Sequence, residues 1–314
     1  MAFLSAQNIV KKYGNYIALN DVSISIEEKS IYGLLGPNGA GKTSLIRILN
    51  QITGPDSGEI IFEGKKLGPE HIAHFGYLPE ERGLYKKMEV GEQVLYLARL
   101  KGMTKSDAAK KLKFWFEKFE IQNWWNKKVE ELSKGMQQKV QFICTVIHQP
   151  RLLILDEPFS GFDPINANLI KNEILSLKKE GSTIILSTHN MASVEELCDD
   201  IALIHRGEKI LAGNVNEIRK QNASNTYEIK FMGNLIAFTN ALWSGFELLE
   251  NQQDGKLCKV KVKLLNNASP NDVIAAVLPH VQLLSFNEVI PTMNDIFIAH
   301  VNSEVPHNIT SLTE

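Results

Sequence analysis

The sequence predicts an α/β protein of two domains, a mixed sheet with a helical insert followed by a small α+β domain. Two observations predict the first domain: short apolar runs alternate with segments of helical periodicity, and a mostly helical stretch, about residues 79–149, interrupts them. The third observation is a polar linker at residues 222–225, beyond which strand and helix patterns alternate again. We therefore expect domains at residues 1–221 and 226–314.

The expected elements of the first domain are strands and helices that alternate along the chain. Strands are expected at residues 22–26, 30–35, 59–62, 152–156, 183–187 and 201–204. Helices are expected at residues 42–50, 92–100, 105–119, 133–148 and 165–179. Strand, helix and strand at this spacing imply a parallel sheet with crossover helices.

The second domain has the predicted order strand, helix, strand, strand, helix, strand, which is the split-βαβ, ferredoxin-like order. Its strands are expected at residues 227–231, 246–250, 257–264 and 281–287, with a turn at 252–255. Its helices are expected at residues 235–243 and 272–278, followed by a last helix at 293–301. The third strand alternates Cys258, Val260 and Val262 with lysines, as a half-buried strand does.

The composition limits the classes of protein. A formal net charge of -2 argues against a broad basic field, so no nucleic-acid partner is expected. No apolar run approaches the roughly 18 residues of a membrane span, and the first residues lack the pattern of a secretory signal. The 3 cysteines are far apart without CxxC spacing, which favours a reduced cytoplasmic compartment.

A phosphate-binding loop is predicted between an apolar strand and a helix, where the sequence matches GxxxxGK[ST]. Its residues are Gly36, Pro37, Asn38, Gly39, Ala40, Gly41, Lys42 and Thr43, and Ser44 follows as a further nucleotide-binding candidate. The glycines let the backbone curl so that its N–H groups face phosphates, and the helix N-terminus favours an anion. In such a loop Lys42 would contact the β- and γ-phosphates of ATP, and Thr43 would bind Mg²⁺.

Two acidic residues follow the apolar run at 152–155, where a buried strand ends. Asp156 is placed to hold Mg²⁺ through water, and Glu157 is the candidate to orient and deprotonate an attacking water. His189 ends the neighbouring apolar run and is the candidate to hydrogen-bond the γ-phosphate. The alternatives without a catalytic role are a solvated acidic turn for Asp156 and Glu157 and a structural role for His189.

The segment Leu132–Lys139, LSKGMQQK, precedes the acidic strand and resembles the LSGGQ signature of the ATP-binding cassette (ABC) ATPases. In that family the signature begins a helix and receives the γ-phosphate of ATP held by another subunit. The resemblance therefore implies that Ser133 and Gly135 bind nucleotide across a head-to-tail pair of ATPase subunits. Lys134 and Met136 depart from the usual Gly and Gln.

The resemblance covers about residues 3–220, with the family's motifs in order. It implies that Tyr13 stacks on adenine. The loop Ser160–Asp163 resembles the family's SALD loop, which crosses the dimer interface, so Asp163 joins the nucleotide-binding candidates. Glu80 stands where the family usually has glutamine, and a carboxylate there can still bind Mg²⁺.

The PEERGLY stretch, residues 79–85, resembles the sodium- and drug-exporter branch of bacterial ABC ATPases, which often carries a small C-terminal domain. This resemblance implies an ATP-hydrolysing subunit that powers export through a separate integral-membrane permease. It also implies a second ATPase subunit, identical or a sister chain, and a position in the cytoplasm against the inner face of the cell membrane. The family docks a permease helix between the Glu80 loop and the helical insert.

Alternatives remain open from the sequence. A soluble ABC ATPase could act on ribosomes or DNA, although the family's translation-factor members carry two cassettes and its repair members carry long insertions. The second domain could bind a regulator or ligand, and the lysines of its third strand could meet an anion or only solvent. His71 and His74, spaced HxxH, are more typical of surface histidines than of a metal pair. The substrate is not written in the chain.

Overall fold

The computed structural model describes residues 2–81, 83–242, 245–265 and 268–303. The chain divides into two compact units, residues 1–215 and 216–314, and each is described here by itself. The division falls at the start of helix α7 (Val215–Gln221), whereas the linker expected at 222–225 follows that helix. The boundary at 221 therefore stays a prediction.

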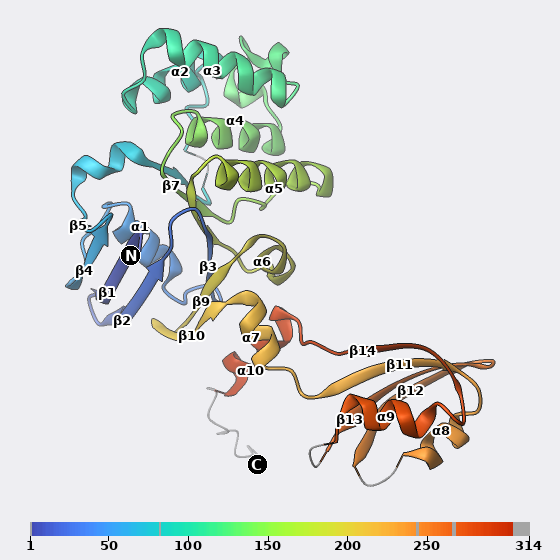
Figure 1. Cartoon of the computed structure of the whole chain (residues 1–314). Coiled ribbons are helices and arrows are strands. Elements are labelled where there is room, and N and C mark those ends of the chain that lie inside the picture. Colours follow the sequence, from blue (N-terminus) through green and yellow to red (C-terminus); the bar gives the residue numbers. More distant parts are fainter. Residues whose placement is uncertain (1, 82, 243–244, 266–267, 304–314) are drawn as a thin grey trace, which may run out of the picture. The chain divides into compact units, whose positions relative to one another are not determined.

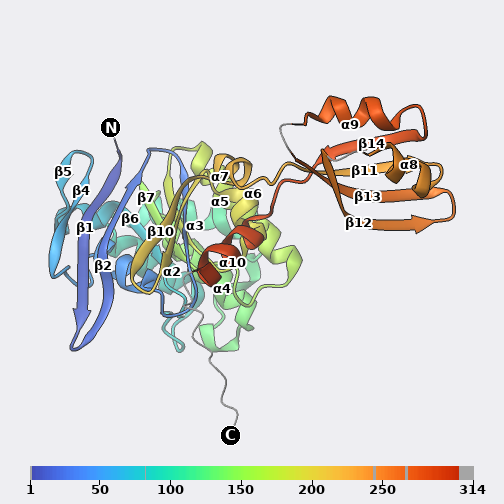
Figure 2. The same ribbon diagram turned by 90° about the horizontal axis from the view of Figure 1, so that it is seen from below.

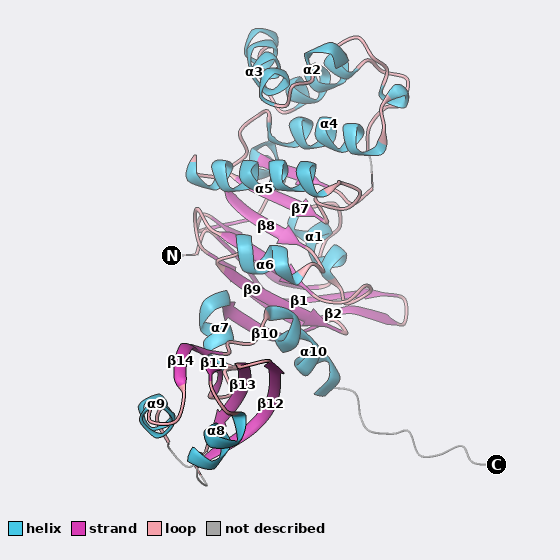
Figure 3. Ribbon diagram, turned by 90° about the vertical axis from the view of Figure 1, so that its right-hand side faces the viewer, coloured by secondary structure: helices cyan, strands magenta, loops and turns pink. Residues whose placement is uncertain are grey.

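A six-stranded sheet forms the centre of the first unit (Figure 3). Its order is β10 (Glu208–Asn214), β9 (Asp200–His205), β3 (Ile31–Leu35), β8 (Thr183–Ser187), β7 (Leu152–Asp156) and β6 (Phe75–Leu78). The strands from β9 to β6 pair in parallel, and β10 is antiparallel to β9. The apolar runs of β3, β7 and β8 are buried throughout, as expected of strands covered on both faces. The predicted parallel sheet is confirmed.

A second sheet is antiparallel and lies beside the first. Its order is β2 (Tyr16–Ile26), β1 (Leu4–Tyr13), β4 (Ser57–Phe62) and β5 (Lys65–Lys66). Helix α1 (Lys42–Leu49) contributes Leu45, Ile46 and Leu49 to the apolar core that joins the two sheets. This packing fixes α1, and with it the loop that precedes it.

The helical insert contains α2 (Val90–Leu100), α3 (Lys105–Lys118) and α4 (Lys134–Val146), with short 3₁₀ turns at Pro69–His74, Gln122–Trp124 and Val129–Glu131 nearby (Figure 1). Trp115 of α3 packs edge-on against Phe119 and Phe142, with ring centroids 5.5 Å and 6.3 Å away. Helices α5 (Pro164–Lys179) and α6 (Met191–Leu197) connect the parallel strands. The insert expected at about 79–149 is therefore a small helical layer with its own aromatic core.

The second unit has the predicted ferredoxin-like order. Its elements are β11 (Thr226–Met232), α8 (Leu235–Ala241), β12 (Phe246–Asp254), β13 (Leu257–Leu264), α9 (Pro270–Val277), β14 (Gln282–Glu288) and α10 (Met293–Ser303). The sheet order is β12-β13-β11-β14 and every pairing is antiparallel. Helices α8 and α9 cover one face (Figure 2), where Phe231 stacks on Phe238 at 4.5 Å.

Two details of this unit differ from expectation. β12 continues through Asp254, so most of the turn predicted at 252–255 is strand. The helix predicted at 235–243 ends at Ala241, and Trp243 lies outside the described residues. The lysine face is paired with acids: Lys259 contacts Glu228 at 2.8 Å and Lys261 contacts Glu250 at 2.8 Å. Across the described part of the chain, no helix has the length and apolar character needed to span a membrane.

Candidate nucleotide site

The phosphate loop runs from the end of β3 to the first turn of α1. A Cβ on Gly36 would lie 2.2 Å from the carbonyl oxygen of Ile204, and one on Gly41 would lie 2.4 Å from that of Ala18. Both glycines also have positive φ, 148° and 113°. Only glycine fits these two positions, so the motif's glycines follow from how closely β9 and β2 approach the loop.

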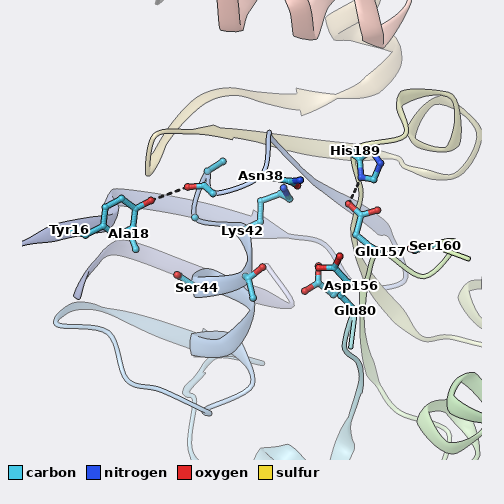
Figure 4. Close-up of a pocket in the computed structure, with 14 residues that line it drawn as sticks. Tyr16, Ala18, Asn38, Lys42, Ser44, Glu80, Asp156, Glu157, Ser160 and His189 are labelled. Carbon is cyan, nitrogen blue, oxygen red and sulfur yellow. Dashed lines mark hydrogen bonds and ion pairs between the residues drawn. The ribbon is translucent and has the colours of Figure 1, made fainter. Parts of the chain in front are cut away.

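This loop lines a pocket of about 360 Å³ at the carboxyl end of the parallel sheet (Figure 4). From the predicted site the pocket brings together Asn38, Gly39, Ala40, Gly41, Lys42, Thr43, Ser44, Glu80, Asp156, Glu157 and His189. They come from α1 and its loop, the loop after β6, the end of β7 and the end of β8. Parallel strands thus deliver residues distant in sequence to one edge.

Lys42 is folded back on its own loop. Its Nζ donates hydrogen bonds to the carbonyl oxygens of Gly36 at 2.7 Å and Pro37 at 3.0 Å. Burial lowers the pKa of this ammonium, and the nearby carboxylates of Glu157, Asp156 and Glu80 oppose that shift. A cation held under the loop, with acids across the pocket, is suited to a polyphosphate carrying a divalent metal ion.

Asp156 is nearly enclosed, with 4% of its surface exposed. Burial raises the pKa of its carboxyl, and the neighbouring charges of Glu80 and Glu157 raise it further. Three carboxylates gathered around one lysine leave the pocket acidic on the side opposite the loop. A divalent cation there would relieve their mutual repulsion.

Glu157 and His189 contact each other. Nδ1 of His189 lies 2.8 Å from Oε1 of Glu157, and the hydroxyl of Thr188 donates to Oε2 at 3.3 Å. β8 lies next to β7, with Asp156 opposite Ser187, which brings the two side chains together (Figure 4). Glu157 also has a positive φ of 48°, a conformation that non-glycine residues adopt at a cost. The backbone thus holds this carboxylate at the turn that faces the loop.

Six predicted residues lie outside the pocket lining. Gly36 and Pro37 hold Lys42 through their carbonyls. Tyr13 is 45% exposed at the end of β1, with Nζ of Lys11 5.5 Å from its ring centroid. The other three lie at helix starts: Ser133 caps α4 by accepting from the N–H of Met136 at 3.3 Å, Gly135 is in its first turn, and Asp163 caps α5.

Several residues of the site were missed by the sequence reasoning. Tyr16, Ala18 and Ser160 line the pocket, and the hydroxyl of Tyr16 donates to the carbonyl oxygen of Gly39 at 3.0 Å. The amide of Gln141 donates to the carbonyls of Pro79 and Glu81 at 3.3 Å and 3.2 Å, on either side of Glu80. Ser160 begins the SALD-like loop, of which only Asp163 is a predicted candidate. No motif marks Tyr16, Ala18 or Gln141, because their contacts arise from packing between distant segments.

The oxygen atoms that the pocket offers suit Mg²⁺ better than they suit a metal ion bound entirely by protein side chains. No group of three or more His, Cys, Asp or Glu side chains suited to a metal is found among the described residues. Thr43, Glu80 and Asp156 instead offer one hydroxyl and two carboxylates in a pocket with room for phosphate oxygens and water. Mg²⁺ is usually bound by few protein ligands together with substrate phosphates and water.

Comparisons with known proteins identify the family of the chain. Residues 19–160 match the family model described as ABC transporter, and residues 213–301 match the model described as ATP-binding protein DrrA1-3-like, C-terminal domain. The uncharacterized ABC transporter ATP-binding protein YhaQ of Bacillus subtilis (strain 168) is 39% identical over 300 residues, which covers 96% of this chain and 99% of that protein.

Two further likenesses, one to a curated protein and one to a solved structure, cover 94% and 70% of the chain. The linearmycin resistance ATP-binding protein LnrL of Bacillus subtilis (strain 168) is 30% identical over 305 residues, covering 94% of this chain and 97% of its own. A solved structure of an ATP binding subunit of an ABC transporter superposes with a TM-score of 0.65 and 31% identity, covering 70% of this chain and 92% of that one. With its phosphate loop, acidic strand end and DrrA-like second unit, the chain belongs to the family of ABC transporter ATP-binding proteins and is a nucleotide-binding ATPase.

Proposed function

We propose that the chain hydrolyses Mg-ATP in the pocket behind the phosphate loop and thereby powers export through a separate membrane permease. The observation that carries the proposal is the convergence of Lys42, Asp156 and Glu157 on one pocket at the end of the parallel sheet. A phosphate-binding lysine, a metal-binding carboxylate and a second carboxylate facing the same space are the parts that phosphoryl transfer to water requires.

We assign the binding of Mg-ATP to the phosphate loop and the side chains around it. The backbone N–H groups at residues 39–44 and the ammonium of Lys42 would hold the β- and γ-phosphates, and Tyr13 would stack on adenine. Thr43, Glu80 and Asp156 would hold Mg²⁺, which neutralises charge on the phosphate oxygens. Entry of phosphates would offer Lys42 charged partners in place of the carbonyls of Gly36 and Pro37.

Glu157 is the proposed general base. Its carboxylate would accept a proton from the water that attacks the γ-phosphorus, while the bond from that phosphorus to the bridging oxygen breaks and ADP leaves. His189 is within hydrogen-bond distance of Glu157 and is placed to orient that carboxylate and to contact the γ-phosphate. The enclosure of the pocket on the Asp156 side favours exclusion of bulk water.

The remaining candidates support a head-to-tail pair. Ser133, Gly135 and Asp163 lie at the starts of α4 and α5 and do not line their own chain's pocket. The start of α4 offers backbone N–H groups to an anion, so Ser133 and Gly135 would reach the γ-phosphate held by a second ATPase subunit. The carboxylate of Asp163 already accepts from the N–H groups of Ile165 and Asn166, so Asp163 would contribute to the interface between the two subunits. Closure on ATP and reopening after hydrolysis would be the motion passed to the permease.

Export is favoured over other transport roles by the likeness to a linearmycin resistance ATP-binding protein along almost the whole chain. ABC transporter ATP-binding subunits work with membrane permeases, so we place this chain in the cytoplasm against the inner face of the membrane. An action on ribosomes or DNA has no observation of the described residues in its favour.

The substitution Glu157→Gln tests the proposal, because the amide keeps the shape of the side chain and cannot accept the proton. We expect ATP turnover to fall by about a hundredfold or more, in the range of general-base removal, with binding of ATP retained. ATP should then trap the variant as a dimer, measured by light scattering after size exclusion. The further change Ser133→Arg should prevent that dimer.

Turnover near the wild-type value in Glu157→Gln would remove Glu157 as the base. The transport half of the proposal has its own test, gentle detergent extraction of membranes that hold the tagged chain. An integral-membrane protein should copurify in proportion to the chain, whereas recovery of ribosomes or DNA-bound assemblies in its place would contradict transport.

A further inference from the structure

A two-residue turn joins β9 to β10 beside the phosphate loop. His205 pairs with Glu208 across this hairpin, so Arg206 and Gly207 form the turn itself. Both have a left-handed backbone, with φ of 48° and 81°. Hairpin turns of this kind favour asparagine, aspartate or glycine at the first position, whereas arginine adopts the conformation at a cost in free energy. An arginine held in a costly conformation indicates that its side chain has a use.

Three hydrogen bonds fix the turn against the phosphate loop and β2. The N–H of Gly207 donates to the carbonyl oxygen of Ala40 at 2.9 Å, and the N–H of Asn20 donates to that of Gly207 at 2.8 Å. Nδ2 of Asn20 also donates to Oε1 of Glu208 at 2.7 Å. The backbone that carries Arg206 is therefore held at the loop.

A hollow of about 190 Å³ is lined by the turn, the phosphate loop and β2. Its lining consists of residues 16–17, 37–40 and 205–206, and we call it the turn hollow. Tyr16 and residues 38–40 also line the nucleotide pocket, so the two spaces share a wall. The turn hollow has about half the volume of the nucleotide pocket, and it is smaller than the roughly 300–1,000 Å³ of sites that hold drug-sized molecules. It has room for a small ion and not for a second nucleotide.

The turn hollow has a basic lining. Arg206 carries a positive charge, and none of the lining residues is acidic. The side chain of Arg206 is exposed and takes part in no ion pair or hydrogen bond with another described residue. A guanidinium presents its five donors as a planar fork that matches two oxygens of a phosphate. Asn38, which is also exposed, brings an amide with two further donors to the same lining.

His205 adds a buried imidazole to the lining of the turn hollow. It is only 9% exposed, and neither ring nitrogen has a hydrogen-bond partner among the described residues. At least one of the two nitrogens carries a hydrogen and donates. Buried polar side chains are paired in most folded proteins, with protein, water or an ion. An acceptor in the turn hollow would supply a partner that no described residue provides.

We propose that the turn hollow is a second anion site, which binds one tetrahedral oxyanion of the size of inorganic phosphate. Two of its oxygens would accept from Arg206, and the others from the amide of Asn38 and the imidazole of His205. Lys42 lines only the nucleotide pocket, so the two anion sites use different cations. Phosphate is also the product of the hydrolysis proposed above; this source of the ion rests on that function, whereas the binding itself does not.

Equilibrium dialysis with radiolabelled inorganic phosphate tests the proposal. A magnesium-bound ATP analogue that cannot be hydrolysed first fills the nucleotide pocket, so that phosphate cannot occupy it. The wild-type chain should still bind one phosphate per chain. The variant Arg206→Asn should bind phosphate at least about tenfold more weakly, as loss of a charged hydrogen-bond partner does. The control Lys209→Asn removes an exposed cation from the same hairpin, outside the turn hollow, and should leave phosphate binding unchanged.

Arg206→Asn separates binding from folding, because Asn-Gly is the pair that such a turn prefers. Its melting temperature should stay the same or rise while phosphate binding falls, and it should bind the ATP analogue as the wild type does. His205→Phe, which keeps a ring without its nitrogens, should also weaken phosphate binding.

Two results would overturn the second anion site. One is that the wild-type chain, once filled with the analogue, binds no phosphate. The other is that phosphate binding survives Arg206→Asn or His205→Phe unchanged. Turnover of ATP by the wild-type chain is measured separately, so failure of this site and failure of the proposed function are told apart.

Discussion

The ionised carboxylate of Asp156 destabilises the folded chain. The pKa of its carboxyl is raised by burial and by the charges of Glu80 and Glu157, so the ionised form is less favoured in the folded chain than in the unfolded chain. Ionisation of Asp156 therefore costs folding free energy above the raised pKa and costs nothing below the ordinary value of 3.8. Mg²⁺ bound at this carboxylate would stabilise its ionised form and so offset the destabilisation of the folded chain.

We predict that Asp156→Asn makes the nucleotide-free chain more stable at neutral pH. The melting temperature should rise by about 2–4 °C for each kcal/mol of relief in a unit of this size. The difference from the wild type should shrink as the pH falls through the raised pKa and vanish below 3.8. Thermal melts from pH 3.5 to 8 measure it, and the added stabilisation by Mg-ATP should disappear in the variant. A gain that persists at the acid end would rule out this electrostatic origin.

The two tyrosines of the first hairpin show a limit of motif reasoning at the same scale. The resemblance to the ABC ATPases implies that Tyr13 stacks on adenine, which stays a prediction, and Tyr13 lies exposed at the end of β1. Tyr16 carries no motif, yet it lines the pocket and contacts Gly39. The pairing of Tyr13 with Tyr16 across the hairpin places both rings near the same turn, a consequence of register that a linear motif does not encode.

Between elements, one ion pair ties the helical insert to the core. Nζ of Lys118 in α3 lies 2.6 Å from Oε1 of Glu173 in α5, and the side chain of Glu173 is only 5% exposed. The lysine also lies over the ring of Trp115, 5.3 Å from its centroid. Because α3 belongs to the insert and α5 connects β7 to β8, this contact joins the insert to a crossover helix of the parallel sheet.

We predict that Glu173→Gln destabilises the first unit by about 1–3 kcal/mol, since it leaves a buried polar contact weakened and a lysine without its charge partner. Urea denaturation followed by tryptophan fluorescence measures the change. The matched control is Glu117→Gln on α3, whose partner Lys113 is 3.9 Å away and largely exposed, and it should change stability by less than about 0.5 kcal/mol. Equal effects in the two variants would refute a special role for Glu173.

At the scale of the whole molecule, the sequence predicts the buried parts better than the edges. β3, β7 and β8 are apolar runs whose ends carry Asp156 and His189, so both the strands and the residues they deliver could be predicted. The end of β12 could not be predicted from the sequence, because this edge strand lacks the alternation of apolar and polar residues that marks a half-buried strand. Its residues from Glu250 to Asp254 are all exposed. A contact such as that of Gln141 with the Glu80 loop forms only when segments distant in the sequence pack together, so no local sequence pattern predicts it.

The second unit has a core of its own, which includes Phe231, Phe238, Val260 and Val273. Phe231 is fully buried and stacks on Phe238 with an interplanar angle of 9°. Because this core is made entirely from residues beyond 215, we expect it to melt separately from the nucleotide-binding unit. Calorimetry of the full chain should therefore show two transitions, of which Mg-ATP raises only one.

The last prediction assigns those transitions. Phe231→Leu removes an aromatic contact from the second core and should cost about 1–2 kcal/mol, which lowers the transition that ATP does not move by roughly 5–15 °C in a unit of this size. The transition raised by Mg-ATP should keep its temperature. Met232→Leu, at the next and 42% exposed position, is the control and should move neither. A single transition that Phe231→Leu and ATP both shift would mean that the two units unfold together, and that events in the second core reach the nucleotide site through shared stability.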